Sequence, residues 1–135
     1  MKDRRRLLAA YNDSSGVTAE FNLNVLNVLN RELKANFDAQ KFFHLADFDQ
    51  QEGWINLWLV SKTTQEVVIP VLSQVIHFEE AERLRTEVSV KFRPNQLEEE
   101  LIKAGFGVRE RFADLSGDYA LLLAQRGIDR APTKG

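Results

Sequence analysis

The sequence predicts an α+β protein in which helices come first, an antiparallel sheet follows, and a helix with a β-hairpin closes the chain. Three patterns support this prediction. Apolar residues recur at helical spacing within residues 19–33, alternate with polar residues within residues 84–92, and return to helical spacing after a proline near the end. We therefore expect an N-terminal module over residues 1–91 and a closing helix and hairpin over residues 92–126. Residues 127–135 offer little to bury and are expected to form a disordered tail.

Composition and charge exclude several classes of function. A net charge of −2 gives no electrostatic reason to expect nucleic acid or an acidic membrane as a partner. The absence of cysteine excludes disulfides, thiolate metal ligands and a cysteine nucleophile. His44 and His77 lack the HExxH spacing of a zinc site, so we expect no metal, a structural role for His44 and an exposed position for His77. No apolar run approaches the ~20 residues of a membrane span, and the charged start is unlike a signal peptide. We expect a cytoplasmic protein.

Two helices are expected at the start of the chain. Residues 2–11 place Leu7, Leu8 and Tyr11 at helical spacing, and residues 12–16 have the composition of a turn. Thr18 is a plausible N-cap for the next helix. The apolar stripe of that second helix consists of Phe21, Val25, Leu26, Val28, Leu29 and Leu33. The same helix carries asparagines at 22, 24, 27 and 30, which are poor helix-interior residues. We expect them either to form hydrogen bonds with neighbouring loops or to lie on an exposed face.

A capped helical turn over residues 38–42 leads into short strands. The strands are expected at residues 43–49, 54–61, 66–72, 74–78 and 84–92. Both faces of the strand over residues 54–61 are apolar, which predicts that it is covered on two sides. Pro70 suggests an edge or a bulge.

The strand over residues 84–92 carries the candidate site. Strict alternation puts Leu84, Thr86 and Val88 on one face and Arg85, Glu87 and Ser89 on the other. Glu87 can accept several hydrogen bonds and Ser89 can donate and accept, so together they could hold the edge of a planar polar group such as an imidazole. The alternative is a solvated strand face.

The last part of the chain reads as helix, strand, turn and strand. Pro94 suits the first turn of a helix over residues 94–104, and Gly105 suits its left-handed end. Strands are expected at residues 106–115 and 118–124, joined by a tight turn at Ser116 and Gly117.

Several segments, in the same order, resemble the histidine-specific, S-adenosylmethionine-dependent methyltransferases of the ergothioneine pathway. They are Ala10-Tyr11-Asn12-Asp13, Gly16-Val17-Thr18-Ala19-Glu20-Phe21-Asn22, Asn30-Arg31-Glu32-Leu33, His44, Leu59-Val60-Ser61, Thr86-Glu87-Val88-Ser89 with Lys91-Phe92, and Ala104-Gly105-Phe106. The resemblance covers about residues 2–126 and is specific because the segments occur together.

The resemblance implies a role for four residues. Family members methylate the α-amino nitrogen of L-histidine three times, giving hercynine. Tyr11 matches the tyrosine that binds the substrate carboxylate, and Glu87 and Ser89 match the pair that holds the imidazole. Leu57 stands where the family commonly has a methionine lining the side-chain pocket. By the same resemblance, residues 1–91 are the substrate-binding module, and residues 92–126 are the closing helix and hairpin of a class I methyltransferase α/β sheet.

The cofactor site of the family is not expected in this chain. It requires a Gly-rich loop between a strand and a helix, whereas Gly105 and Gly107 follow a predicted helix. Two hypotheses therefore remain open. The chain is either the C-terminal, histidine-binding part of a histidine Nα-methyltransferase, inactive without its N-terminal half, or a free-standing, non-catalytic module that binds an amino acid or a partner. In both cases we expect an exposed sheet edge to be covered by the missing half or by a homodimer.

Overall fold

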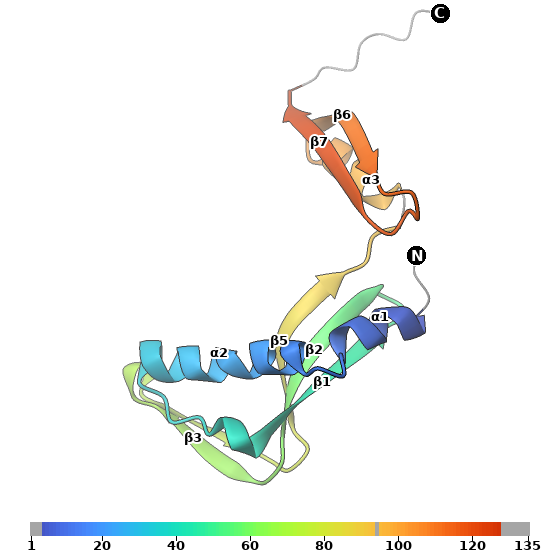
Figure 1. Cartoon of the computed structure of the whole chain (residues 1–135). Coiled ribbons are helices and arrows are strands. Elements are labelled where there is room, and N and C mark those ends of the chain that lie inside the picture. The colour runs from blue at the N-terminus through green and yellow to red at the C-terminus, as the bar shows by residue number, and fades with distance from the viewer. Residues whose placement is uncertain (1–3, 94, 128–135) are drawn as a thin grey trace, which may run out of the picture. The chain divides into compact units, whose positions relative to one another are not determined.

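The computed structural model describes residues 4–93 and 95–127 of the protein. They form two compact units, one within residues 3–90 and one within residues 91–135, which we call the N-terminal unit and the C-terminal unit. Both combine α-helix with antiparallel strands, so the α+β class predicted from the sequence is confirmed (Figure 1). Pro94 and the part of the expected tail beyond Gly127 lie outside the described residues.

The described elements follow in the order α1 (Arg4–Tyr11), α2 (Val17–Leu33), η1 (Ala39–Lys41), β1 (Phe42–Asp49), β2 (Trp54–Ser61), β3 (Gln65–Ile69), η2 (Pro70–Leu72), β4 (Gln74–Phe78), β5 (Arg83–Val90), α3 (Gln96–Lys103), β6 (Phe106–Ala113) and β7 (Ala120–Arg126). The strand expected to reach Leu72 ends at Ile69, because Pro70 lacks the N–H that a ladder requires and begins a 3-10 turn instead. As expected, Asp38 caps η1 by accepting the N–H of Gln40 at 3.0 Å.

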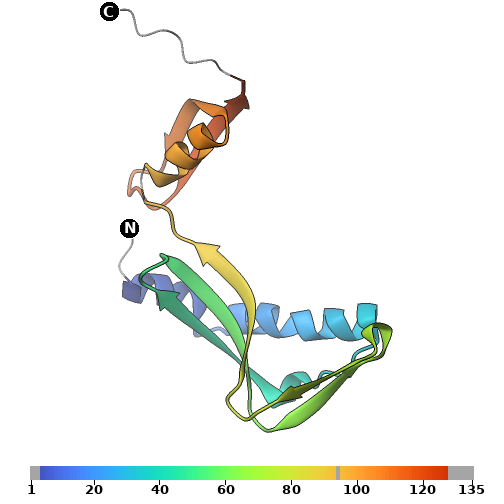
Figure 2. The same cartoon turned by 180° about the vertical axis from the view of Figure 1, so that it is seen from behind.

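A three-stranded antiparallel sheet in the order β1-β2-β5 organises the N-terminal unit. β2 lies in the centre, and most of its residues are buried, as its apolar faces predicted. Front and back views show α1 and α2 together on one face of this sheet (Figures 1 and 2). The hairpin β3–β4 forms a separate two-stranded sheet.

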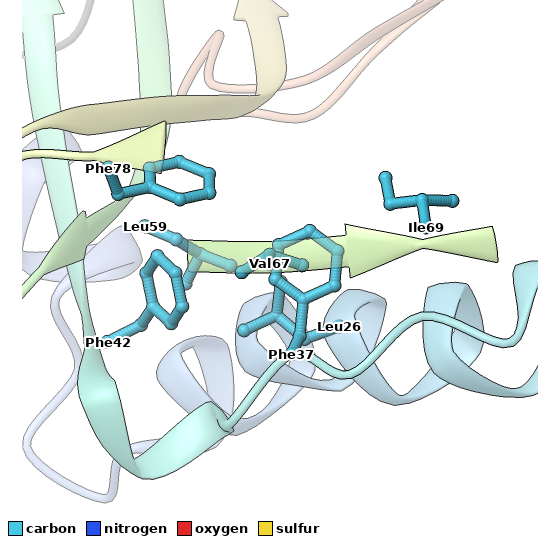
Figure 3. Close-up of a cluster of buried hydrophobic side chains, with 7 residues drawn as sticks. All are labelled: Leu26, Phe37, Phe42, Leu59, Val67, Ile69 and Phe78. Carbon is cyan, nitrogen blue, oxygen red and sulfur yellow. The ribbon is translucent and has the colours of Figure 1, made fainter. Parts of the chain in front are cut away.

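The larger apolar cluster lies where α2 meets the β1–β2 and β3–β4 sheets. Its buried members are Leu26, Phe37, Phe42, Leu59, Val67, Ile69 and Phe78 (Figure 3). The rings of Phe42 and Phe78 meet edge to face with centroids 5.4 Å apart, a favourable aromatic geometry. This cluster holds α2 on the sheet.

A second, smaller cluster holds α1 on the same face of the sheet. It consists of Leu7, Ala46, Phe48, Ile55 and Leu57, with Leu8 and Tyr11 packed against it. The two clusters therefore attach two helices to one sheet at neighbouring places.

The turn between the helices is built around Asp13. Its carboxylate accepts the backbone N–H groups of Val17 and Thr18, both at 3.0 Å, and the hydroxyl of Ser15 at 2.6 Å. Thr18 was expected to cap α2, and this is wrong: Asp13 supplies the cap from outside the helix, and Gly16 occupies the cap position with φ +75°. Glycine adopts that left-handed conformation without the steric cost that a Cβ atom brings.

The C-terminal unit has α3 beside a β6–β7 hairpin, and Glu98 of α3 forms an ion pair with Arg111 of β6. Gly105 ends α3 with φ +82°, as its position predicted. No described residue of α3, β6 or β7 is buried. Large apolar side chains remain exposed, among them Phe106, Phe112, Leu121 and Leu123. One helix and two strands do not enclose a core.

Neighbouring phenylalanines of β1 test the larger cluster. We expect Phe42→Ala to lower the free energy of unfolding by about 3–5 kcal/mol, because the ring is 1% exposed and its removal leaves a cavity. Phe43→Ala is the matched control, since that side chain is 45% exposed and should cost below about 1 kcal/mol. Urea unfolding measures both, and equal losses would contradict the cluster.

Asp13 gives a prediction for the pH dependence of stability. Hydrogen bonds from Ser15 and Thr18 hold the pKa of the Asp13 carboxyl well below its ordinary 3.8. Its stabilising contribution is therefore complete above that ordinary value and is lost as the pH falls towards the pKa of the folded state. We expect Asp13→Asn to lower Tm at pH 7 and this difference to shrink below pH 4, measured by thermal unfolding at each pH. A difference that stays constant down to pH 2 would contradict the assignment.

Candidate functional site

A β-bulge in β5 determines which side chains face the helices. Leu57 of β2 pairs with Glu87, but the next residue, Trp58, pairs with Arg85, so Thr86 is the extra residue. A bulge of this kind interrupts the alternation of side chains along a strand. The predicted alternation over residues 84–92 is therefore wrong across Thr86.

The bulge puts Leu84 on the same face as Glu87 and Ser89. Leu84 pairs with Leu59 and packs against the larger cluster under α2. Glu87 pairs with Leu57, and directly paired residues of antiparallel strands point to the same face. The shared face of Glu87 and Ser89, which the sequence predicted, is thus the face that carries α1 and α2.

Tyr11 and Ser89 are brought together on this face. Tyr11 is the last residue of α1, and its phenol lies 2.9 Å from the hydroxyl of Ser89, 78 positions away in the sequence. Ser89 pairs with Ile55, whose side chain belongs to the cluster beneath α1. The packing of α1 therefore positions the phenol over β5.

Glu87 lines a pocket between α2 and β5. The pocket has a volume of about 280 Å³ and is lined by Phe21, Asn22, Asn24, Val25, Val28, Thr86 and Glu87. Glu87 is exposed, and the described residues contain no hydrogen bond or ion pair to its carboxylate. The carboxylate is thus accessible to a ligand in the pocket.

Leu57 lies in the core rather than on this pocket. Its side chain is 2% exposed and belongs to the cluster that Tyr11 packs against. Among the four residues singled out in the sequence, the structure joins Tyr11 to Ser89 by a hydrogen bond and packs Tyr11 against the cluster that contains Leu57. It places Glu87 directly opposite Leu57.

Asn22 is a buried polar residue whose role the sequence analysis missed. Its side-chain nitrogen contacts Nδ1 of His44 at 2.9 Å and donates to the carbonyl oxygen of Trp58 at 3.0 Å. Its oxygen accepts the hydroxyl of Thr86 at 2.5 Å. A signal was available, because Asn22 stands one helical turn before Leu26 on the buried stripe. Phe21, expected on that stripe, is 69% exposed instead.

The two histidines differ in their surroundings. Both ring nitrogens of His44 have partners, Nδ1 to Asn22 and Nε2 to the carbonyl oxygen of Tyr11 at 2.9 Å. His77 is exposed on β4, as expected, and its Nδ1 lies 3.0 Å from Glu66. Within residues 4–93 and 95–127, no group of three or more His, Asp or Glu side chains gathers closely enough to hold a metal ion.

On the opposite face of the sheet, Asp47 joins β1 to β2. Its carboxylate accepts hydrogen bonds from the amide of Asn56 at 3.1 Å and from the indole of Trp58 at 2.9 Å. The arrangement satisfies the polar atom of a half-buried tryptophan.

None of the helices in the described part of the chain is long and apolar enough to cross a bilayer.

Comparison with known proteins gives consistent matches. A family model described as histidine-specific, SAM-dependent methyltransferase matches residues 1–126. The chain is similar to histidine N-alpha-methyltransferases of Mycolicibacterium smegmatis and Mycobacterium tuberculosis, with 44% and 43% identity over 126 residues. Each match covers 93% of this chain and 39% of the relative, so the chain spans well under half the length of these relatives.

A double-mutant cycle tests the contact between α1 and β5. We expect Tyr11→Phe and Ser89→Ala to be coupled by about 1 kcal/mol in the free energy of unfolding, because each removes one member of the same partly buried hydrogen bond. Denaturant unfolding of the wild type, both single variants and the double variant gives the coupling. Strictly additive effects would show that the two hydroxyls do not interact.

Proposed function

Because the chain belongs to the histidine-specific, S-adenosylmethionine-dependent methyltransferase family, we propose that it supplies the histidine-binding part of an L-histidine Nα-methyltransferase. Such an enzyme transfers methyl groups to the α-amino nitrogen and gives hercynine. In this proposal Tyr11 holds the substrate carboxylate, and Glu87 and Ser89 hold the imidazole.

The contact between Tyr11 and Ser89 is the observation that carries the proposal. It sets the end of α1 against the strand that also presents Glu87, so a phenol, a hydroxyl and a carboxylate share one sheet face. L-Histidine offers complementary groups, a carboxylate at one end and a ring with N–H and N atoms at the other. A charge-assisted hydrogen bond from an imidazole N–H to Glu87 would be the strongest single contact.

In this proposal, the role of this part of the protein in catalysis is to orient the substrate. Methyl transfer to an amine is an in-line displacement that needs a neutral, correctly placed amine and little covalent help from the protein, so placement supplies most of the acceleration. Two fixed ends of the substrate define where its α-amino nitrogen lies. Leu57 acts beneath the site by supporting Tyr11 rather than by chemistry.

The described residues do not fit S-adenosylmethionine itself. Binding of such a cofactor in this class of fold needs a Gly-rich loop that follows a strand and opens a helix. Gly105 ends α3, and Gly107 lies within β6, so neither glycine opens a helix. We therefore assign the methyl donor to a part of the enzyme that this chain does not supply.

The exposed apolar side chains of the C-terminal unit favour a partner chain. In the proposal, α3 and the β6–β7 hairpin complete the sheet of the methyltransferase domain. Two observations support this. The described residues of α3, β6 and β7 enclose no core, and Phe112, Leu121 and Leu123 are exposed. These three side chains share one face of the hairpin, because Phe112 pairs with Leu121 and Leu123 stands two residues further along the strand. Burial of such a face against the rest of the enzyme, or against a second copy of the chain, would remove apolar surface from water.

Reassembly of an active enzyme tests the proposal. The chain is combined with the part of the Mycolicibacterium smegmatis relative that it does not match, and methylated histidine is measured by mass spectrometry with S-adenosylmethionine as donor. We expect methyl transfer, and we expect Glu87→Ala to raise KM for L-histidine by about tenfold to a hundredfold, because a hydrogen bond to a charged group is lost.

Glu66→Ala is the matched control, since Glu66 is an exposed glutamate on β3 paired with His77. It should leave KM unchanged. The reassembled parts of the relative itself serve as the positive control. Transfer by that control but not by the chain, or equal effects of the two substitutions, would reject the proposed function. Calorimetric titration of the chain alone with L-histidine then tests the alternative of a non-catalytic binding module.

A further inference from the structure

A chain of hydrogen bonds runs from β5 to the end of α1 and includes Asn22 and Thr86 of the pocket lining. It passes from Thr86 to Asn22, from Asn22 to His44, and from His44 to the backbone of Tyr11. These residues belong to β5, α2, β1 and α1, so the chain of hydrogen bonds crosses four elements that are distant in the sequence. Its ends lie beside the two groups of side chains that are proposed to hold the substrate.

The orientation of the Asn22 amide follows from its partners. The carbonyl oxygen of Trp58 can only accept, so the atom 3.0 Å from it is the amide nitrogen. The same nitrogen lies 2.9 Å from Nδ1 of His44. The amide oxygen then faces Thr86, whose hydroxyl donates to it. With 4% of its surface exposed, Asn22 has little access to water as a substitute partner.

The amide in turn fixes the tautomer of His44. Because the Asn22 nitrogen donates to Nδ1, that ring nitrogen must be unprotonated, and the proton of the neutral ring is on Nε2. Nε2–H then donates to the carbonyl oxygen of Tyr11. This carbonyl belongs to the last residue of α1, where helical carbonyl groups have no partner within the helix. His44 therefore caps α1.

We propose that Asn22 and His44 are positioning residues that set the distance between the carboxylate-binding and imidazole-binding ends of the histidine site. The inference rests on the proposed function and deepens it. Thr86 adjoins Glu87 in the bulge, and Tyr11 carries the phenol, so the hydrogen bonds through Asn22 and His44 connect the two ends. A loss of either residue frees the end of α1 to shift relative to β5.

Such a shift acts on the substrate and not on the methyl donor. A displacement of about 1 Å can cost about a hundredfold in rate, and the displaced groups here are those proposed to bind L-histidine. KM for L-histidine should therefore respond to Asn22 and His44, whereas KM for S-adenosylmethionine should stay constant. A residue with a purely structural role would lower stability and leave both constants unchanged.

The test uses the reassembled enzyme described above. We expect Asn22→Leu, which keeps the branched shape of the side chain but none of its hydrogen bonds, and His44→Leu to raise KM for L-histidine by about tenfold or more. His44→Gln, which retains one donor and one acceptor, should recover part of the loss. Nitrogen-15 shifts of the wild-type chain should show His44 protonated at Nε2 and not at Nδ1.

Two controls separate positioning from stability. Asn27→Leu changes an exposed asparagine of the same helix and should alter neither KM nor Tm strongly. Val67→Ala destabilises the larger cluster away from the site and should lower Tm without raising KM for L-histidine. An unchanged KM in Asn22→Leu, or a proton on Nδ1 of His44, would overturn the inference alone. A wild-type assembly without transfer activity would instead overturn the proposed function, and the inference with it.

Discussion

The bulge at Thr86 is the feature on which the candidate site depends. Without it, Leu84 and Glu87 would lie on opposite faces of the sheet, and burial of Leu84 under α2 would turn Glu87 away from both helices. The extra residue lets an apolar position and a carboxylate share one face. The cost of the interrupted ladder is offset locally, because the Thr86 hydroxyl lies within hydrogen-bonding distance of both the Leu57 carbonyl oxygen, at 3.0 Å, and the Asn22 amide oxygen.

The two apolar clusters and the polar contacts between them have different roles. Burial of apolar side chains holds α2 over Phe42 and Leu59 and holds α1 over Ile55 and Leu57. Because the hydrophobic effect has no preferred direction, such burial tolerates small sliding of a helix along the sheet. The hydrogen bonds of Asn22 are directional and are costly to break in a buried place. Apolar packing therefore supplies the stability of the arrangement, and the buried amide selects one position for the helices.

The sequence predicted the helices and strands well because their periodicities are local. Alternation and helical spacing located α2, β2 and β4 within a few residues, and Gly105 marked the end of α3. The errors arose where a distant partner decides the outcome. Thr18 has the chemistry of a cap, but Asp13 reaches the same N–H groups from the preceding turn.

The candidate site shows the same limit. The shared face of Glu87 and Ser89 followed from their spacing, and a common site with Tyr11 was suggested by resemblance. The bulge could not be read from β5 alone, because its position depends on which residues of β2 pair with it. Asn22 was detectable as a polar residue on a buried stripe, but its partners His44 and Thr86 come from two strands far along the chain.

The short length of α1 makes tertiary contacts decisive for Tyr11. A helix of eight residues is marginal in water by itself, so its position depends on what it packs against. Leu7 enters the cluster beneath it, and His44 caps its last carbonyl. The side chain of Asn12 exchanges two hydrogen bonds of 3.3 Å with the backbone of Ala46, which fixes the chain directly after the helix. Three contacts to β1 and β2 thereby hold the end of α1 that carries the phenol of Tyr11, so under the proposed function a ligand would meet a preorganised group and lose little affinity to ordering it.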